Sequence, residues 1–292
     1  MKPLKGIRVL EVGTLLPGSE AAVLLKELGA TVIRVVPPAK LQQGLPAHFL
    51  DPLGRGKRLL PLDLKSEKDR KRLECALAKS DILLLGLRTQ GLAKLGLTLA
   101  SLHKRHRRLI ICSINGFNKA GPYADRAGHD LNYLALAGLL GHNRDATGRP
   151  VIPPVPFADM VGGAMSAVIV CLAALAARGK TKQGSVVEVC MTDQVARLLE
   201  FQKIDPLKLL EGSLPRYNVY KTADGGYVSL ACLEPKFFLN FCEVVGHPEW
   251  QRWATTFDEP LEQELSALFL SMPLDHWREL GLKRDICLTP VI

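Results

Sequence analysis

The sequence predicts an α/β fold: an open, mostly parallel sheet flanked by helices, followed by a smaller α+β region. The first observation is an alternation of short apolar runs with helical patterns through the first 199 residues. Residues 7–12 and 31–36 are typical of strands, and residues 21–28, which end at Gly29, are typical of a helix. This β-α-β order predicts parallel strands joined by a right-handed crossover. The second observation is a change of pattern after about Leu199.

The remaining elements of the first region follow in the same order. Further strands are predicted at residues 59–63, 82–86, 109–114 and 185–189, with helices at 67–79 and 160–178 and a turn at 16–18. Ligands of such sheets bind outside the carboxyl ends of the strands. Arg88 and the loop that leads to His129 both follow strands, so both are expected at that edge.

The second region begins with a hairpin and continues with helices. Residues 217–220 and 227–232 are predicted to pair across the turn Ala-Asp-Gly-Gly, and residues 235–245 and 261–270 are predicted helices. We therefore predict a large domain at residues 1–199 and a small α+β domain at residues 200–292.

Composition limits the classes of function. The 292 residues are 47% hydrophobic and 23% charged, as in ordinary globular proteins, and the net charge is +9. A basic balance suits a polyanion such as nucleic acid, an acidic membrane or a phosphorylated ligand. No zinc-finger spacing or aromatic-rich RNA motif accompanies the basic clusters, so no nucleic-acid partner is expected. The clusters at residues 68–72 and 104–108 are expected to be solvated faces of helices.

The cysteines and the apolar runs indicate the cellular compartment in which the protein is expected. Seven cysteines occur singly, without C-x-x-C, which indicates reduced thiols, and no signal peptide is evident, so a cytoplasmic protein is expected. The uncharged run at residues 160–177 is rich in Ala and Gly, and we interpret it as a buried helix, not a membrane span. No metal is expected, because no ligand cluster is present, and no redox cofactor, because G-x-G-x-x-G is absent after the first strand.

Three residues are candidates for acid–base chemistry. His129 is followed directly by Asp130, and Asp159 and Glu234 lie in distinctive contexts further along the chain. Histidine titrates near neutrality, so it can take up a proton in one step and return it in another. Each residue also has a plain structural explanation: Asp159 as a helix N-cap, Glu234 before Pro235 as a helix start, and His129 as an ordinary packed residue.

These motifs together resemble the class III CoA-transferase superfamily, of the CaiB/BaiF type. The opening Pro-Leu-Lys-Gly-Ile-Arg-Val-Leu-Glu-Val-Gly, the block at residues 55–65 and the block at residues 121–133 are similar to its signatures. The form Gly-His-Asp-Leu-Asn-Tyr is most similar to the α-methylacyl-CoA racemase branch. The resemblance covers nearly the whole chain.

The resemblance implies a fold, an assembly and site residues. The fold is a Rossmann-like large domain with a small domain, and the assembly is an interlocked homodimer. His129 and Asp159 match the racemase acid–base pair, and Glu234 matches the glutamate that supports the histidine. Coenzyme A is then part of the substrate and not a separate cofactor; the residues expected to bind it are Arg58, Leu62, Arg88 and Asp130.

Several positions depart from the family pattern. Pro37 stands where a CoA-contacting arginine is usual, and Arg88 is followed by Thr-Gln-Gly in place of Pro-Gly. Relatives are expected to continue beyond the position of Ile292, in a segment that returns to the large domain.

Three functions remain open on these residues. The first is a racemase or epimerase of 2-methylacyl-CoA thioesters in lipid metabolism, acting through an enolate, which the helix N-terminus after Asp159 could stabilise. The second is a CoA-transferase that uses Asp159 as nucleophile, and the third is a shortened, inactive CoA-binding homologue. His129 and Glu234 favour the first over the second, and the residues do not define the acyl chain.

Overall fold

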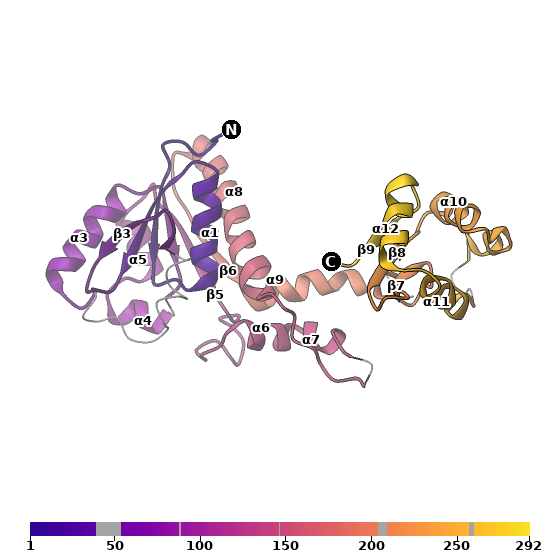
Figure 1. Ribbon diagram of the computed structural model, residues 1–292. Coiled ribbons are helices and arrows are strands. Elements are labelled where there is room, and N and C mark those ends of the chain that lie inside the picture. Colours follow the sequence, from indigo (N-terminus) through magenta and orange to yellow (C-terminus); the bar gives the residue numbers. More distant parts are fainter. Residues whose placement is uncertain (39–53, 88, 146, 204–208, 257–259) are drawn as a thin grey trace. The chain divides into compact units, whose positions relative to one another are not determined.

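The computed structural model shows two compact units, Met1–Leu199 and Glu200–Ile292, and each is described by itself (Figure 1). The structure describes residues 1–38, 54–87, 89–145, 147–203, 209–256 and 260–292.

The first unit is built on a parallel sheet, which confirms the predicted α/β class. Six strands pair in the order β3-β2-β1-β4-β5-β6, and every pair is parallel. The order reverses direction between β1 and β4, the arrangement of doubly wound folds that leaves a crevice at the carboxyl edge. The strands are β1 (Arg8–Val12), β2 (Thr31–Val36), β3 (Arg58–Pro61), β4 (Ile82–Leu85), β5 (Ile110–Asn115) and β6 (Val186–Cys190).

Helices cover both faces of this sheet. One face packs against α1 (Leu16–Glu27), α8 (Ser166–Thr181) and α9 (Met191–Leu198), and the same core also includes α6 (Asp130–Ala137), which contacts α9, and α7 (Leu139–His142), which contacts α6. The other face packs against α3 (Glu67–Ala78), α4 (Thr89–Lys94) and α5 (Leu99–Arg105). A sheet covered on both sides buries its central strands almost completely, which explains why β4 and the first half of β5, Ile110–Cys112, are apolar without alternation.

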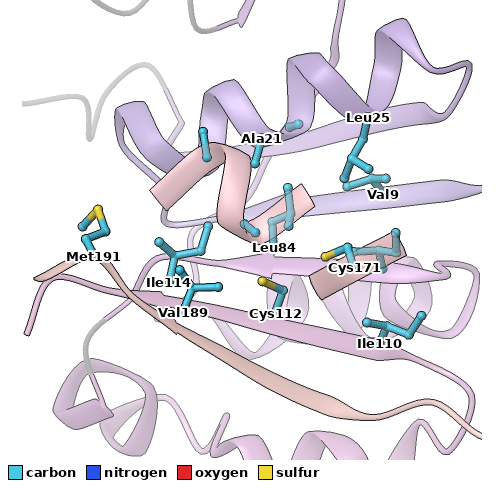
Figure 2. Packing of buried hydrophobic residues seen from close by; sticks show 14 of the residues in the cluster. Val9, Ala21, Leu25, Leu84, Ile110, Cys112, Ile114, Cys171, Val189 and Met191 are labelled. Atoms are coloured by element: carbon cyan, nitrogen blue, oxygen red, sulfur yellow. The ribbon is translucent and has the colours of Figure 1, made fainter. Parts of the chain in front are cut away.

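Side chains of neighbouring strand positions point to opposite faces and build two cores. Val9, Leu84 and Ile110 point toward Leu25 of α1 and Cys171 of α8 (Figure 2). The intervening positions of the same strands point toward α3, α4 and α5. Because every strand pair is parallel, the carboxyl ends of all six strands lie along one edge of the sheet.

The start of α1 differs from the sequence prediction. We predicted a turn at residues 16–18 and a helix from residue 21, but the helix begins at Leu16, so the predicted turn is wrong. Pro17 lies in the first turn, where its missing N–H costs nothing and its fixed φ suits the helix. The consequence is that the N-terminal turn of α1 lies directly after β1, at the carboxyl edge.

The long apolar helix predicted at residues 160–178 also differs from the prediction, because it begins earlier and its first part is not an α-helix. Its first part, η2 (Ala158–Met165), is a π-helix, and α8 follows without interruption. Within Ala158–Thr181 an 18-residue window has a mean hydropathy of 2.2, so this helix is long and apolar enough to cross a membrane, but one such helix is weak evidence for a span. Its small residues Ala164, Ala167 and Cys171 pack into the core beneath the sheet. Single-turn π segments in long helices are frequent at functional sites.

The second unit is an antiparallel three-stranded sheet packed against helices. The predicted hairpin is present as β7 (Tyr217–Lys221) and β8 (Tyr227–Ala231), and β9 (Leu288–Pro290), which was not predicted, pairs with β8. The helices are α10 (Pro235–Val245), α11 (Glu262–Leu270) and α12 (Leu274–Lys283), with 3₁₀ segments η3 (Leu199–Lys203), η4 (Leu209–Glu211) and η5 (Pro248–Trp253). Phe238, Phe241, Phe269 and Trp277 fill the core of this unit.

Candidate active site

A pocket of about 510 Å³ opens at the carboxyl edge of the first unit's sheet. Its floor is made by residues that directly follow β1, β4 and β5, on both sides of the point where the strand order reverses. This is the edge at which ligands of open α/β sheets bind. The walls are mainly apolar, and the lining residues are Thr14, Leu15, Leu16, Pro17, Gly18, Gly86, Ile114, Asn115, Gly116, Phe117, Lys119, Ala124, Arg126, Ala127, Gly128, His129, Tyr133, Asp159 and Met191.

Two of the predicted catalytic residues, His129 and Asp159, line this same pocket. They are 30 positions apart in the sequence and come from different elements: His129 is the residue before α6, and Asp159 lies in the first turn of η2. Folding therefore brings an imidazole and a carboxyl group to one cavity. Tyr133 supports the histidine's loop by donating its hydroxyl to the Gly128 carbonyl.

His129 is positioned by the start of α6. The side-chain oxygen of Asn132 accepts a hydrogen bond from the His129 main-chain N–H at 3.1 Å, which fixes the chain where the helix begins. The His129 side chain itself is solvent-exposed at the pocket. An exposed imidazole that faces a cavity can exchange its proton with solvent between turnovers.

Asp130 holds the segment that carries Asp159. Its Oδ1 accepts a hydrogen bond from the Asp159 main-chain N–H at 2.8 Å, and its carboxylate also accepts one from the N–H of Ala158. Asp130 thus joins the starts of α6 and η2. It does not line the pocket, so the structure gives this predicted CoA-binding residue a role in holding the site together.

The pKa of the Asp159 carboxyl lies well above the usual range of an aspartate. Burial is the larger cause and the nearby Asp130 carboxylate is the second, and together they raise its pKa to about 7. A group with a pKa near the working pH can both donate and accept a proton. This is the condition that an acid–base role for Asp159 requires.

The main-chain N–H groups at the start of η2 are already bonded. The Asp159 N–H donates to Asp130, and the Met160 N–H donates to the Pro156 carbonyl at 2.9 Å. The expectation that an enolate oxygen rests on these groups therefore does not fit this conformation. The N-terminal turn of α1 also lines the pocket.

α1 and η2 pack closely at Gly163, because the absence of a side chain there lets Pro17 of α1 lie against η2. A Cβ built on Gly163 would lie 2.5 Å from the Cβ of Pro17 and 2.9 Å from the sulfur of Met191. No larger residue fits without a shift of one of these elements. Gly163 is one turn along η2 from Asp159, so this contact sets the distance between Asp159 and the start of α1.

Of the other predicted residues, Arg58 and Leu62 do not line the pocket. Arg58 is exposed at the first position of β3, and the side chain of Leu62 is buried in the second core at 2% exposure, where it cannot contact a ligand. Arg88 lies outside the described residues. Glu234 is exposed in the second unit, at the residue before α10, which is the helix start that its Glu-Pro sequence predicted.

Sequence reasoning missed the α1 wall, from Thr14 to Gly18. The signal that could have found it is Pro17, which favours the first turn of a helix as much as a turn. Within the described ranges, no group of three or more His, Cys, Asp or Glu side chains is placed to hold a metal ion.

Comparison with known protein families matches residues 4–292 to the model of CoA-transferase family III. The chain belongs to this family. A CaiB/BaiF CoA-transferase family protein of Caenorhabditis elegans is 33% identical, with 99% of this chain and 86% of that protein covered.

Relatives in the family have two kinds of named activity. Human α-methylacyl-CoA racemase is 32% identical over 99% of this chain and 78% of its own length. The succinate–glutarate CoA-transferase of Agrobacterium fabrum is 30% identical over 84% of this chain and 66% of its own length. Family membership therefore establishes an enzyme family with racemase and CoA-transferase members, and leaves the reaction to be decided by the site.

Solved structures of family members have the same fold. A hypothetical protein of Mycobacterium tuberculosis superimposes with a TM-score of 0.82 at 28% identity, covering 97% of this chain and 82% of that one. A CaiB/BaiF family protein of Brucella suis gives a TM-score of 0.80 at 25% identity, with 100% and 84% covered.

Proposed function

We propose that this protein is a racemase or epimerase of 2-methylacyl-CoA thioesters. The observation that carries the proposal is the pairing of His129 with Asp159 in one mainly apolar pocket, with the pKa of Asp159 raised to about 7. Inversion at the carbon beside a thioester needs one group that removes the α-proton and a second that returns a proton from the opposite face. A racemase relative at 32% identity supports the same assignment.

The proposed reaction is balanced in protons. In one direction neutral His129 takes the α-proton, the electron pair moves into the thioester as an enolate, and protonated Asp159 delivers a proton to the other face. The product leaves an imidazolium at His129 and a carboxylate at Asp159. The reverse direction uses the Asp159 carboxylate as base and the imidazolium as acid, which restores the starting state.

Two further parts of the proposal rest on the family resemblance. Glu234 is proposed to hydrogen-bond the far nitrogen of His129 and fix its tautomer. The active form is proposed to be a homodimer in the cytoplasm, and light scattering together with turnover measurements tests the assembly. A fully active monomer would contradict the dimer without affecting the acid–base pair.

Isotope exchange tests the reaction itself. Each pure enantiomer of a 2-methylacyl-CoA is incubated with the protein in deuterium oxide. We expect deuterium at the α-carbon and loss of optical purity for both enantiomers. A folded sample that binds the thioester but exchanges no α-proton would contradict the racemase proposal and favour an inactive CoA-binding homologue.

The second candidate is a CoA-transferase that uses Asp159 as nucleophile. The transferases among the relatives favour it, since a pocket carboxylate is also what acyl transfer requires. Such an enzyme forms an activated ester of CoA or acyl group on Asp159, which hydroxylamine intercepts. Inactivation that depends on acyl-CoA and maps to Asp159 would establish the transferase, whereas a racemase keeps its activity in hydroxylamine.

A further inference from the structure

A buried charge network lies behind the α1 wall of the pocket, and neither His129 nor Asp159 belongs to it. Glu11 of β1 and Lys57 form an ion pair at 2.8 Å with side-chain exposures of 1% and 0%. Arg34 pairs with Glu11 in register on the neighbouring strand and lies 3.4 Å from its carboxylate. These charges lie in the core, where an ion pair is costly to bury.

The network is directed at the first turn of α1. The ammonium group of Lys57 donates to the Glu11 carboxylate, to the Ser19 carbonyl at 2.8 Å and to the Ser19 hydroxyl at 2.7 Å. Its three donors are therefore all used. Arg34 also donates to the Ser19 hydroxyl, at 2.5 Å, so two cations converge on one α1 residue.

The same network reaches the pocket lining directly. The Thr14 hydroxyl donates to the Glu11 carboxylate at 2.5 Å, and Thr14 lines the pocket. Residues 14 and 19 bracket the turn that contains Leu16, Pro17 and Gly18, all pocket residues. Glu11 binds Thr14 before this turn, and Lys57 binds Ser19 after it, so the pair fixes both ends of the turn.

The held turn contacts the helix that carries Asp159. Pro17 lies against Gly163, with no room for a Cβ between them, and Gly163 is one turn from Asp159. A connected path runs from Lys57 through Ser19 and Pro17 to η2. An apolar pair in place of a buried ion pair is often as stable, so stability alone does not account for these charges.

We infer that Lys57, together with Glu11, is a positioning residue for the reaction: it fixes the first turn of α1 against η2 and so sets the shape of the pocket at Asp159. The inference rests on the proposed function for its kinetic consequence. It concerns alignment and not chemistry, because Lys57 is not a pocket residue. Misplacement of reacting groups by about 1 Å can cost about 100-fold in rate.

The test compares two charge-removing double variants on the same sheet. Glu11→Gln/Lys57→Met removes both charges of this pair while the glutamine keeps an acceptor for Thr14. The matched control is Asp81→Asn/Arg178→Met, which removes a partly buried 2.9 Å ion pair at the opposite, amino edge of the sheet. Denaturant unfolding measures the free energy of unfolding of both variants, so that their kcat values can be compared at a known loss of stability.

We expect the Glu11/Lys57 variant to lose about 10–100-fold in kcat for α-deuterium exchange, with KM changed less than three-fold. The control variant is expected to keep kcat at comparable loss of stability. Single Lys57→Met is a second variant, which leaves the Glu11 carboxylate paired with Arg34 and is expected to lower kcat in the same direction, because the contacts of Lys57 with Ser19 are lost. Equal kcat losses in the two double variants, or an unchanged kcat in the Glu11/Lys57 variant, would overturn the inference.

Hydrogen–deuterium exchange separates this inference from the proposed function. Amides of residues 18–23 are expected to exchange faster in the Glu11/Lys57 variant than in wild type, and unchanged in the control. If the wild-type protein exchanges no α-proton, the racemase proposal fails and this measurement decides the positioning role. Unchanged amide exchange at α1 would then show that the pair does not fix this turn.

Discussion

The carboxylate of Asp130 accepts the Asp159 main-chain N–H at 2.8 Å and also raises the pKa of the Asp159 carboxyl. The Asp130 side chain therefore positions the main chain of Asp159 and contributes to the raised pKa of the Asp159 carboxyl. Burial is the larger cause of the raised pKa, and the Asp130 charge is the second. The first prediction follows from separating these two effects.

Asp130→Asn should lower the pKa of Asp159 from about 7 without returning it to the ordinary range. The amide oxygen can still accept the Asp159 N–H, but the neighbouring negative charge is gone, while burial remains. Where Asp159 acts as the acid, the rate falls as pH rises through its pKa, so this limb should move to lower pH. The pH profile of α-deuterium exchange measures the shift.

Asp125→Asn is the control for that profile. Asp125 is an exposed carboxylate in the same loop and does not line the pocket. Its profile should match wild type. A limb that stays in place in Asp130→Asn would show that Asp159 does not titrate as the acid.

Asp159→Asn should stabilise the fold at alkaline pH. Below about pH 4 the Asp159 carboxyl is protonated in folded and unfolded chains alike; between about 4 and 7 only the folded chain keeps the proton. A raised pKa therefore makes wild type less stable as pH rises through this window. We expect a gain of roughly 2–4 kcal/mol at pH 8, after allowing for solvent screening, that vanishes near pH 4.

Urea unfolding of both proteins at pH 4, 6 and 8 measures this difference. Asp193→Asn offers a comparison, because that carboxylate is exposed. A constant difference between Asp159→Asn and wild type at all three pH values would contradict a raised pKa at Asp159.

His129→Ala and Asp159→Ala should each abolish racemisation, with rate losses of about 10²–10⁴-fold. Each variant keeps one base, so each should still exchange the α-proton of one enantiomer, slowly and with retention. The two variants are expected to select opposite enantiomers. Nuclear magnetic resonance of each enantiomer in deuterium oxide reports the exchange, and calorimetry with CoA checks that binding is kept. The same residual enantiomer in both variants would exclude opposite faces for the two groups.

Gly163→Ala should destabilise the first unit by about 1–3 kcal/mol and reduce turnover. The added methyl would lie 2.5 Å from Pro17, so α1 or η2 must shift. Gly179→Ala on α8 is the matched control, because nothing lies within 4 Å of the new Cβ. That variant is expected to gain up to about 1 kcal/mol from helix propensity. Thermal unfolding compares them, and equal stabilities would mean that the Pro17 contact yields easily.

Strong local signals were enough to predict most helices and strands, and the residue types alone suggested candidates for the site. The alternation of strands and helices and the hairpin at the start of the second unit were predictable, because periodicity and turn residues act over a few positions. His129 and Asp159 were candidates from their residue types, and the structure places both at one pocket. The family resemblance added the expected pairing of these two residues. Local patterns were ambiguous at Pro17, where a helix start and a turn share the same residue preferences.

The positions of these groups depend on contacts between segments that are far apart in the sequence. The contact of Asp130 with Asp159 joins segments 29 positions apart, and Lys57 reaches Ser19 and Glu11 over 38 and 46 positions. The pKa of Asp159 depends on burial and on a neighbouring charge, and both exist only after the sheet has brought α1, α6 and η2 to one edge. Such distances between side chains leave no periodicity in the sequence, because they follow from the packing of whole elements around a common core.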